Sequence, residues 1–290
     1  MTNIRILQAA FKQVYQYKKV VFLLYISVVA LAVFAAYPFQ QYWSSKVGHS
    51  LMLSDMIKGF DYTLINDFNN TYGMGLSPIL QQSSILLIVF ALVLVFFMGG
   101  ILALFKQQGN NYDGNLFWSA SATYFWRMFR LTFIFAIIHA FVFWLFIQLY
   151  LSLTQGMSPN NLMTDTVLFS TFYMLLFLYL LVGAFFFMWH DYAKVQLVKN
   201  DNRWVVKSIF LSLGFTLKNP FKTYSLYLLN MLLLVLLFAL NYGISHFLVV
   251  ASGTTILLSL LLSQVLVLAR LYVKLLNLSS IFMVVNNTIK

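Results

Sequence analysis

The sequence predicts an all-α integral membrane protein, and three observations support this fold class. Apolar residues occupy 61% of the 290 positions and charged residues only 9%, against about 45–50% and about 25% in soluble domains. Six apolar stretches are each long enough to cross a bilayer, and nearly all cations flank them on one side. A surface this apolar requires lipid as its solvent.

The six predicted spans follow from the length of each apolar stretch. A spanning helix needs about 20 apolar residues, because it rises about 1.5 Å per residue through hydrocarbon about 30 Å thick. The windows that meet this requirement are residues 20–38, 83–105, 131–153, 166–189, 223–242 and 254–272. Asn241, Gly243 and Gly253 favour a turn between the last two windows, so we expect these to form one hairpin.

The cations predict the orientation of the chain. Of the 18 lysines and arginines, all except Lys46 and Lys58 precede an odd-numbered span or follow an even-numbered one. Cytoplasmic flanks carry the excess of lysine and arginine in membrane proteins. We therefore expect three helical hairpins with both termini in the cytoplasm.

A basic, amphipathic stretch precedes each odd-numbered span. The apolar residues at helical spacing are Ile4, Leu7, Phe11 and Val14, then Phe117, Ala120, Tyr124 and Met128, then Val206, Phe210, Leu213 and Leu217. Such helices lie in the plane of the membrane interface and bend into the span that follows, and Asn219-Pro220 marks the third bend, into the fifth span. Within a single membrane domain, 1–290, the layout predicts repeat-like units at 1–110, 111–199 and 200–290. The alternative is that the layout only reflects the basic inner loops of any hairpin protein.

The first outer loop, residues 39–82, is the longest segment on the predicted outer side. We expect a helix within 44–57, followed by a segment that Asn69, Asn70, Gly73, Gly75 and Pro78 interrupt. Asp55, Asp61 and Asp67 recur at six-residue intervals, which does not place them on one helix face. Calcium needs about six to eight oxygen ligands, so we expect a solvated outer face and no metal site.

The composition leaves little catalytic chemistry. The chain has no Glu and no Cys, and only seven Asp, which excludes disulfides, thiolate metal sites and cysteine catalysis. No His-Glu-x-x-His pattern or glycine-rich phosphate loop occurs. We expect no enzyme activity and no cofactor. The net charge of +11 fits cytoplasmic flanks and anionic lipid headgroups better than nucleic acid.

Several polar and small residues fall inside the predicted spans. His139 and Gln148 lie in the third span and Asn230 in the fifth. In lipid such side chains more often join helices through hydrogen bonds, worth about 0.6–2 kcal/mol each, than bind substrate. Gly99-Gly100 in the second span predicts the close approach of another helix.

The strongest polar group lies at the predicted inner ends of spans four and six. Span four ends in His190-Asp191-Tyr192-Ala193-Lys194, and span six carries Gln264, Arg270 and Lys274. An ionised group at the bilayer centre costs at least about 2.5–3.5 kcal/mol, so such groups usually pair. We expect a structural tie between Asp191 and Arg270, and the alternative is a substrate or proton site on the same residues.

The run Asp191-Tyr192-Ala193-Lys194 with the later Gln264, Arg270 and Lys274 resembles a group of bacterial six-span inner-membrane proteins. Phe60-Asp61-Tyr62 and Asp67-Phe68 in the outer loop add to the resemblance. In layout these proteins are similar to the membrane domains found beside some glycerophosphodiester phosphodiesterases. The resemblance implies the six-span topology and a bacterial inner membrane, and it implies no activity, because no phosphodiesterase domain is recognisable in this sequence.

These observations favour a non-catalytic inner-membrane protein, an accessory or scaffold that engages anionic lipid headgroups and partner membrane proteins. The alternative is a small-solute transporter, since transporters bind solutes near the bilayer midplane, often on broken helices. Its polar residues would be His139, Gln148, Asn230, Gln264, Asp191 and Arg270.

Overall fold

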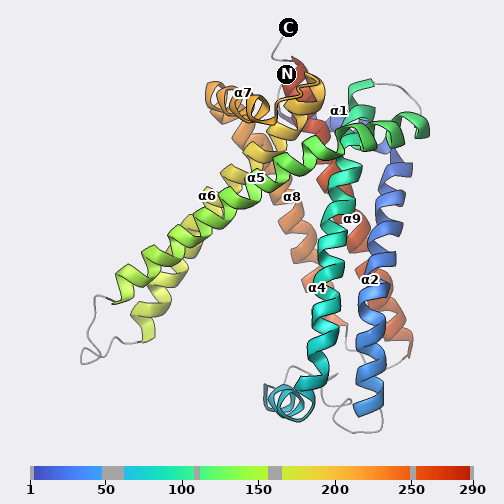
Figure 1. Ribbon diagram of the computed structural model, residues 1–290, viewed down its shortest axis with the longest axis vertical. Helices are drawn as coiled ribbons and strands as arrows, with labels where there is room; N and C mark the ends of the chain where they lie inside the picture. The colour runs from blue at the N-terminus through green and yellow to red at the C-terminus, as the bar shows by residue number, and fades with distance from the viewer. Residues whose placement is uncertain (1–2, 48–61, 108–111, 156–164, 249–252, 288–290) are drawn as a thin grey trace. The chain divides into compact units, whose positions relative to one another are not determined.

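The computed structural model describes residues 3–47, 62–107, 112–155, 165–248 and 253–287. Within these ranges every regular element is a helix and no strand occurs, which confirms the all-α class. The helices are α1 (Asn3–Gln16), α2 (Lys18–Val47), α4 (Tyr62–Gln107), α5 (Gly114–Gln155), α6 (Asp165–Lys199), α7 (Val205–Lys218), α8 (Pro220–Phe247) and α9 (Gly253–Asn287) (Figure 1).

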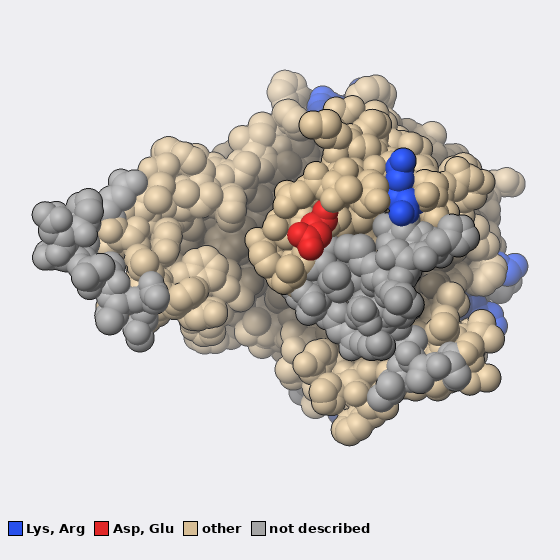
Figure 2. All heavy atoms as spheres, turned by 90° about the horizontal axis from the view of Figure 1, so that it is seen from below, with Lys and Arg blue, Asp and Glu red and all other residues tan. Residues whose placement is uncertain are grey.

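Six of these helices, α2, α4, α5, α6, α8 and α9, are long and apolar enough to cross a membrane. Their most apolar windows have mean hydropathies between 2.1 and 3.1, and each helix contains one of the predicted spans. The chain is therefore a multi-pass helical membrane protein. On the face drawn in Figure 2, charged side chains are few and most of the visible described surface is uncharged.

Two of the helix boundaries confirm predicted breaks. α1 ends at Gln16, directly before the first predicted span, and α2 begins at Lys18. α7 ends at Lys218 and α8 begins at Pro220, while Asn219 between them leaves the helical region with φ −130° and ψ 52°. Proline restricts the residue before it and lacks an N–H, so the chain bends where the sequence predicts.

No helix break accompanies the predicted bend into the third span. α5 continues from Gly114 through Arg130 to Gln155 without interruption. This segment contains neither Pro nor an internal Gly that would end the helix. The last two spans are separate helices as predicted, but α8 continues through Asn241 and Gly243 to Phe247, and α9 begins at Gly253.

The outer loop is also more helical than predicted. α2 continues to Val47, and α4 begins at Tyr62 and runs through Gly73, Gly75 and Pro78. Contacts with α2 explain this: the rings of Trp43 and Phe68 lie 4.4 Å apart, and Tyr42 Oη donates to the Tyr72 carbonyl at 2.7 Å. Tertiary contacts override local propensity here, and α4 changes direction after its first turns (Figure 1). Most of the helix predicted within 44–57 lies outside the described residues, as do Asp55 and Asp61.

Contacts divide the chain into two compact units. The first consists of Met1–Phe11, Val95–Leu229 and Asn277–Lys290, and the second of Lys12–Leu94 and Asn230–Leu276. In the first unit, α5 and α6 run side by side and α7 packs against α6 (Figure 1). The two units cut across the three repeat-like ranges, which stay a prediction.

Gly99 and Gly100 lie where α4 meets α5 in the first unit. A Cβ atom on Gly99 would lie 2.8 Å from Tyr124 Cβ, and one on Gly100 would lie 2.5 Å from the Phe117 carbonyl oxygen. Only glycine fits at these two positions, which confirms the predicted close approach of helices.

Candidate functional site

The last turns of α6 are enclosed on every side within the first unit. All residues from 192 to 198 are buried, including the polar side chains of Lys194 and Gln196. A helix segment that is buried on every face has other protein around it on all sides. The run Asp191-Tyr192-Ala193-Lys194 therefore extends into this enclosed segment.

Asp191 and Lys194 form an ion pair inside α6. Lys194 Nζ donates to Asp191 Oδ1 at 2.8 Å, and the two side chains are only 11% and 20% exposed. From α9, Asn277 Nδ2 donates to Asp191 Oδ2 at 2.9 Å. Both carboxylate oxygens thus accept a hydrogen bond, and the charges neutralise each other one helical turn apart.

Two polar atoms in this segment and its partner helix are buried without a hydrogen bond among the described residues. They are the Tyr192 hydroxyl and Asn277 Oδ1. A buried polar atom without a partner costs about 1–3 kcal/mol.

A second polar group begins where α6 ends. The Asp201 N–H donates to the Val198 carbonyl at 3.4 Å, and the Asn202 N–H donates to the Leu197 carbonyl at 3.1 Å. This pattern closes a helix with a left-handed residue, usually glycine. Asp201 takes that position with φ 45°, which aspartate tolerates better than most residues.

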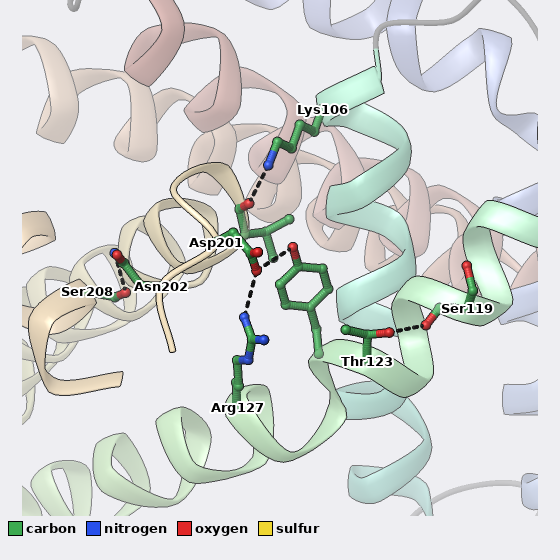
Figure 3. Close-up of polar contacts among 9 residues, drawn as sticks. Lys106, Ser119, Thr123, Arg127, Asp201, Asn202 and Ser208 are labelled. Atoms are coloured by element: carbon green, nitrogen blue, oxygen red, sulfur yellow. Dashed lines mark hydrogen bonds and ion pairs between the residues drawn. The ribbon is translucent and has the colours of Figure 1, made fainter. Parts of the chain in front are cut away.

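The side chain of Asp201 joins this turn to α5. Arg127 Nη1 donates to Asp201 Oδ1 at 2.7 Å, and Tyr124 Oη donates to the same oxygen at 3.0 Å (Figure 3). The hydrogen bond from Arg127 lowers the pKa of Asp201 below its ordinary value, against a weaker effect of desolvation. Asp201 is 62% exposed, so the pair contributes only about 0–1 kcal/mol to stability.

Two lysines bind carbonyl groups at helix ends. Lys106 Nζ, at the end of α4, donates to the Val198 carbonyl of α6 at 3.1 Å (Figure 3). Lys199 Nζ, at the end of α6, donates to the Val285 carbonyl of α9 at 2.8 Å. The last carbonyls of a helix lack intrahelical partners and carry partial negative charge, so cations stabilise them. The end of α6 is thereby tied to α4, α5 and α9.

The structure brings together only part of the predicted polar site. Asp191 and Lys194 are paired in the first unit, whereas Gln264, Arg270 and Lys274 belong to the second. There, Gln264 Oε1 accepts a hydrogen bond from Tyr25 Oη at 2.9 Å, joining α9 to α2. Arg270 and Lys274 are exposed. The tie between Asp191 and Arg270 stays a prediction.

The other predicted polar residues lie in different environments. The ring of His139 stacks on Phe187 with centroids 4.2 Å apart, and its buried Nε2 has no hydrogen-bond partner among the described residues. Asn230 is 3% exposed, whereas Gln148 is exposed. Asp67 is exposed on α4, and Asp61 lies outside the described residues.

Sequence reasoning missed Asn277, Lys199 and Asp201. It ended the fourth span at Trp189, whereas α6 continues to Lys199, so Asp191 lies within the helix and Asp201 directly beyond it. One signal was present: Asp201 is an isolated acid in a basic segment of a chain with only seven aspartates. Nothing comparable marks Asn277, whose partner is 86 positions away.

The amphipathic stretches differ in which face they bury. On α5 the predicted apolar stripe turns inward, because Phe117, Ala120 and Met128 are buried. On α7 the residues buried are Val205, Ser208, Ile209, Ser212 and Thr216. The predicted stripe of α7 faces outward, with Phe210 67% and Leu217 61% exposed.

Comparison with protein-family models, curated proteins and solved structures finds no match to this chain. Within the described ranges, no three His, Asp or Glu side chains gather closely enough to hold a metal ion.

Proposed function

We propose that this chain is a non-catalytic accessory or scaffold protein of a bacterial inner membrane, which engages anionic lipid headgroups and partner membrane proteins. The observation that carries the proposal is the orientation of α7. This helix turns a face rich in hydroxyl groups toward the protein and an apolar face outward. A helix of a water-soluble protein would bury the opposite face.

The inward face of α7 is satisfied without water. Ser212 Oγ and Thr216 Oγ1 donate to the carbonyls of Ile209 and Leu213 at 2.8 and 2.9 Å, and Ser208 Oγ accepts from Asn202 at 3.1 Å. The small side chains let α7 pack closely on α6. Each of these three buried hydroxyl groups therefore has a hydrogen-bond partner, which reduces the cost of burying it.

The outward face of α7 is suited to the membrane interface. Phe210 and Leu217 are exposed, and burying a side chain of this size in hydrocarbon stabilises by about 1.5–3 kcal/mol. Lys207 and Lys218 are exposed on the same helix. Each cation near an anionic membrane surface adds about 1 kcal/mol, screened within about 8–10 Å at physiological salt. These properties support an interfacial helix that holds anionic lipid.

The α5–α6 hairpin supplies a surface for partner membrane proteins. Large apolar side chains are exposed along both of its helices, among them Phe133, Phe141, Trp144, Phe169, Tyr173 and Phe177. Aromatic side chains present a large contact area with little conformational entropy to lose. Such a surface suits the apolar face of another spanning helix.

Purification in a mild detergent tests the scaffold proposal. We expect partner membrane proteins to co-purify in a fixed stoichiometry, and a photo-reactive residue at Phe177 to form one discrete protein adduct. The matched control is the same residue at Phe39, an exposed aromatic of α2 outside the hairpin. Equal labelling at both positions, without a stoichiometric partner, would contradict the proposal.

A small-solute transporter is the second candidate, and the buried Asp191–Lys194–Asn277 group favours it. Charged and polar side chains inside spans often mark the path of a solute or proton. Counterflow of labelled solute pools in proteoliposomes would test this function. Transport by the native protein that Asn277→Ala abolishes would support it, and absence of counterflow across the solute pools would contradict it.

A further inference from the structure

An open groove lies where α6, α7 and α8 meet in the first unit. Its volume is about 350 Å³. Phe185 and Met188 of α6, Leu217 of α7, and Pro220, Phe221 and Leu228 of α8 line it. The groove thus follows the bend at Asn219, where the interfacial helix turns into the fifth span.

The groove is suited to a hydrocarbon chain. An apolar cavity of roughly 150 Å³ already holds a benzene molecule, and this groove is more than twice as large. Phe221 is 89% exposed and Leu217 is 61% exposed, so the protein leaves these two lining side chains uncovered. In a bilayer the chain of a neighbouring lipid is the apolar group that reaches such a surface.

Two lysines directly neighbour groove-lining residues in the sequence, and the acid on α6 near the lining, Asp191 three residues after Met188, is paired with Lys194. Lys218 directly follows the lining residue Leu217, and Lys222 directly follows Phe221. No Asp or Glu occurs anywhere in the sequence after Asp201. Lys218 ends the interfacial helix α7, and Lys222 lies in the first turn of the fifth span, α8. A cation at the start of a span is at the depth where phosphate headgroups meet hydrocarbon.

We propose that the groove binds one anionic phospholipid of the surrounding bilayer, with an acyl chain against Leu217, Phe221 and Leu228 and the phosphate at Lys218 and Lys222. This site deepens the proposed engagement of lipids, on which it rests. The apolar lining provides affinity for any phospholipid chain. The two lysines provide the preference for an anionic headgroup.

Native mass spectrometry of the full chain, delipidated in detergent and titrated with phosphatidylglycerol or phosphatidylcholine, tests the headgroup preference. We expect one molecule of phosphatidylglycerol to bind more tightly than phosphatidylcholine. Lys218→Gln with Lys222→Gln should weaken phosphatidylglycerol binding about fivefold for each lysine removed and leave phosphatidylcholine binding unchanged. The control, Arg130→Gln with Arg203→Gln, removes two exposed cations outside the groove and outside α7 and should retain the preference.

A second pair of variants tests the groove itself. Leu228→Trp places a large ring in the lining and should abolish the single tight site for both lipids. Leu236→Trp, at a leucine of α8 that is 49% exposed and outside the lining, should not. Equal lipid occupancy in these two variants would overturn the assignment of the lipid site to the groove. Equal headgroup preference in the Lys218→Gln, Lys222→Gln variant and its control would overturn the role of Lys218 and Lys222.

The same preparations separate this site from the proposed scaffold. If Leu228→Trp loses the lipid while partner proteins still co-purify, both proposals are supported. If no partner co-purifies from the native protein although the tight lipid site is present, the scaffold proposal fails and the groove stands.

Discussion

Asn277 Nδ2 donates a hydrogen bond to Asp191 Oδ2 at 2.9 Å and so joins α9 to α6 within the first unit. The other carboxylate oxygen is held by Lys194 at 2.8 Å. Asp191 therefore serves two purposes: it neutralises a buried ammonium group, and it fixes one helix against another. The two purposes can be separated by mutation.

Asp191→Asn should destabilise the protein strongly, because it leaves the ammonium group of Lys194 enclosed without its counter-charge. Breaking a buried pair in this way costs about 3–5 kcal/mol, and the 20% exposure of Asp191 places the expected loss at the lower end. The double variant with Lys194→Gln should cost less than the sum of the single variants. Thermal unfolding in detergent measures this coupling, and additive losses would show that the pair does not act as a unit.

Arg270→Gln tests the partner that the sequence predicts for Asp191. If the two charges pair, combining Arg270→Gln with Asp191→Asn should cost less than the sum of the separate losses. Asn277→Ala provides the comparison within the first unit, since its hydrogen bond to Asp191 is direct. If the stability losses of Asp191→Asn and Arg270→Gln add up, whereas those of Asp191→Asn and Asn277→Ala do not, then Asp191 does not pair with Arg270. Its partners are then Lys194 and Asn277 of the first unit.

Gly100→Ala should destabilise the contact of α4 with α5 by about 1–3 kcal/mol, the cost of forcing extra volume into a packed core. Its Cβ would lie 2.5 Å from the Phe117 carbonyl oxygen, which belongs to the backbone and cannot rotate away. Gly183→Ala is the matched control, because no atom lies within 4 Å of the added Cβ. There alanine should be neutral or stabilise α6 by about 0.5–1 kcal/mol. An equal loss of thermal stability in both variants would contradict the close approach.

The pair formed by Asp201 and Arg127 should contribute stability that depends on pH. The pKa of Asp201 is lower in the folded protein than the value of about 3.9 expected when unfolded. Its contribution is therefore complete above that pH and is lost as the pH falls through the folded pKa. The stability difference between the native protein and Asp201→Asn should shrink from about 0–1 kcal/mol at pH 6 toward zero below about pH 4. Thermal unfolding across this range measures it, with Asp67→Asn as the exposed control.

The predicted orientation can be tested with single cysteines, because the chain has none of its own. Ser45→Cys, at an exposed position near the end of α2, should react with an impermeant thiol reagent in intact cells. Ser119→Cys, exposed near the start of α5, should react only after the membrane is opened. The reverse pattern would place the termini outside.

The sequence was sufficient to predict the six long helices, because hydropathy is averaged over a whole segment and a single polar residue changes that average little. The break at Asn219-Pro220 was also predictable from the chemistry of proline alone. Local signals failed at Pro78, where the contact between Trp43 and Phe68 holds the first turns of α4 against α2. Helix propensity describes a residue and its local segment, so it carries no information about contacts with distant residues.

The candidate site was only partly predictable for the same reason. Asp191 and Lys194 are one helical turn apart, so periodicity brings them together. Asn277 lies 86 positions from its partner Asp191 in the sequence, so no local sequence pattern predicts their contact. For α7, the sequence identified the apolar stripe, but only the packing of Ser208 and Ser212 against the protein shows which way the stripe faces.

The spacing of the Asp191–Lys194 pair has a consequence for the biosynthesis of the protein. The chain is made from its N-terminus, so α6 leaves the ribosome before Asn277 has been synthesised, 86 residues later. During that interval the carboxylate already has its ammonium partner within the same helix. The helix can enter the membrane as an electrically neutral segment, and the later arrival of α9 locks it in place.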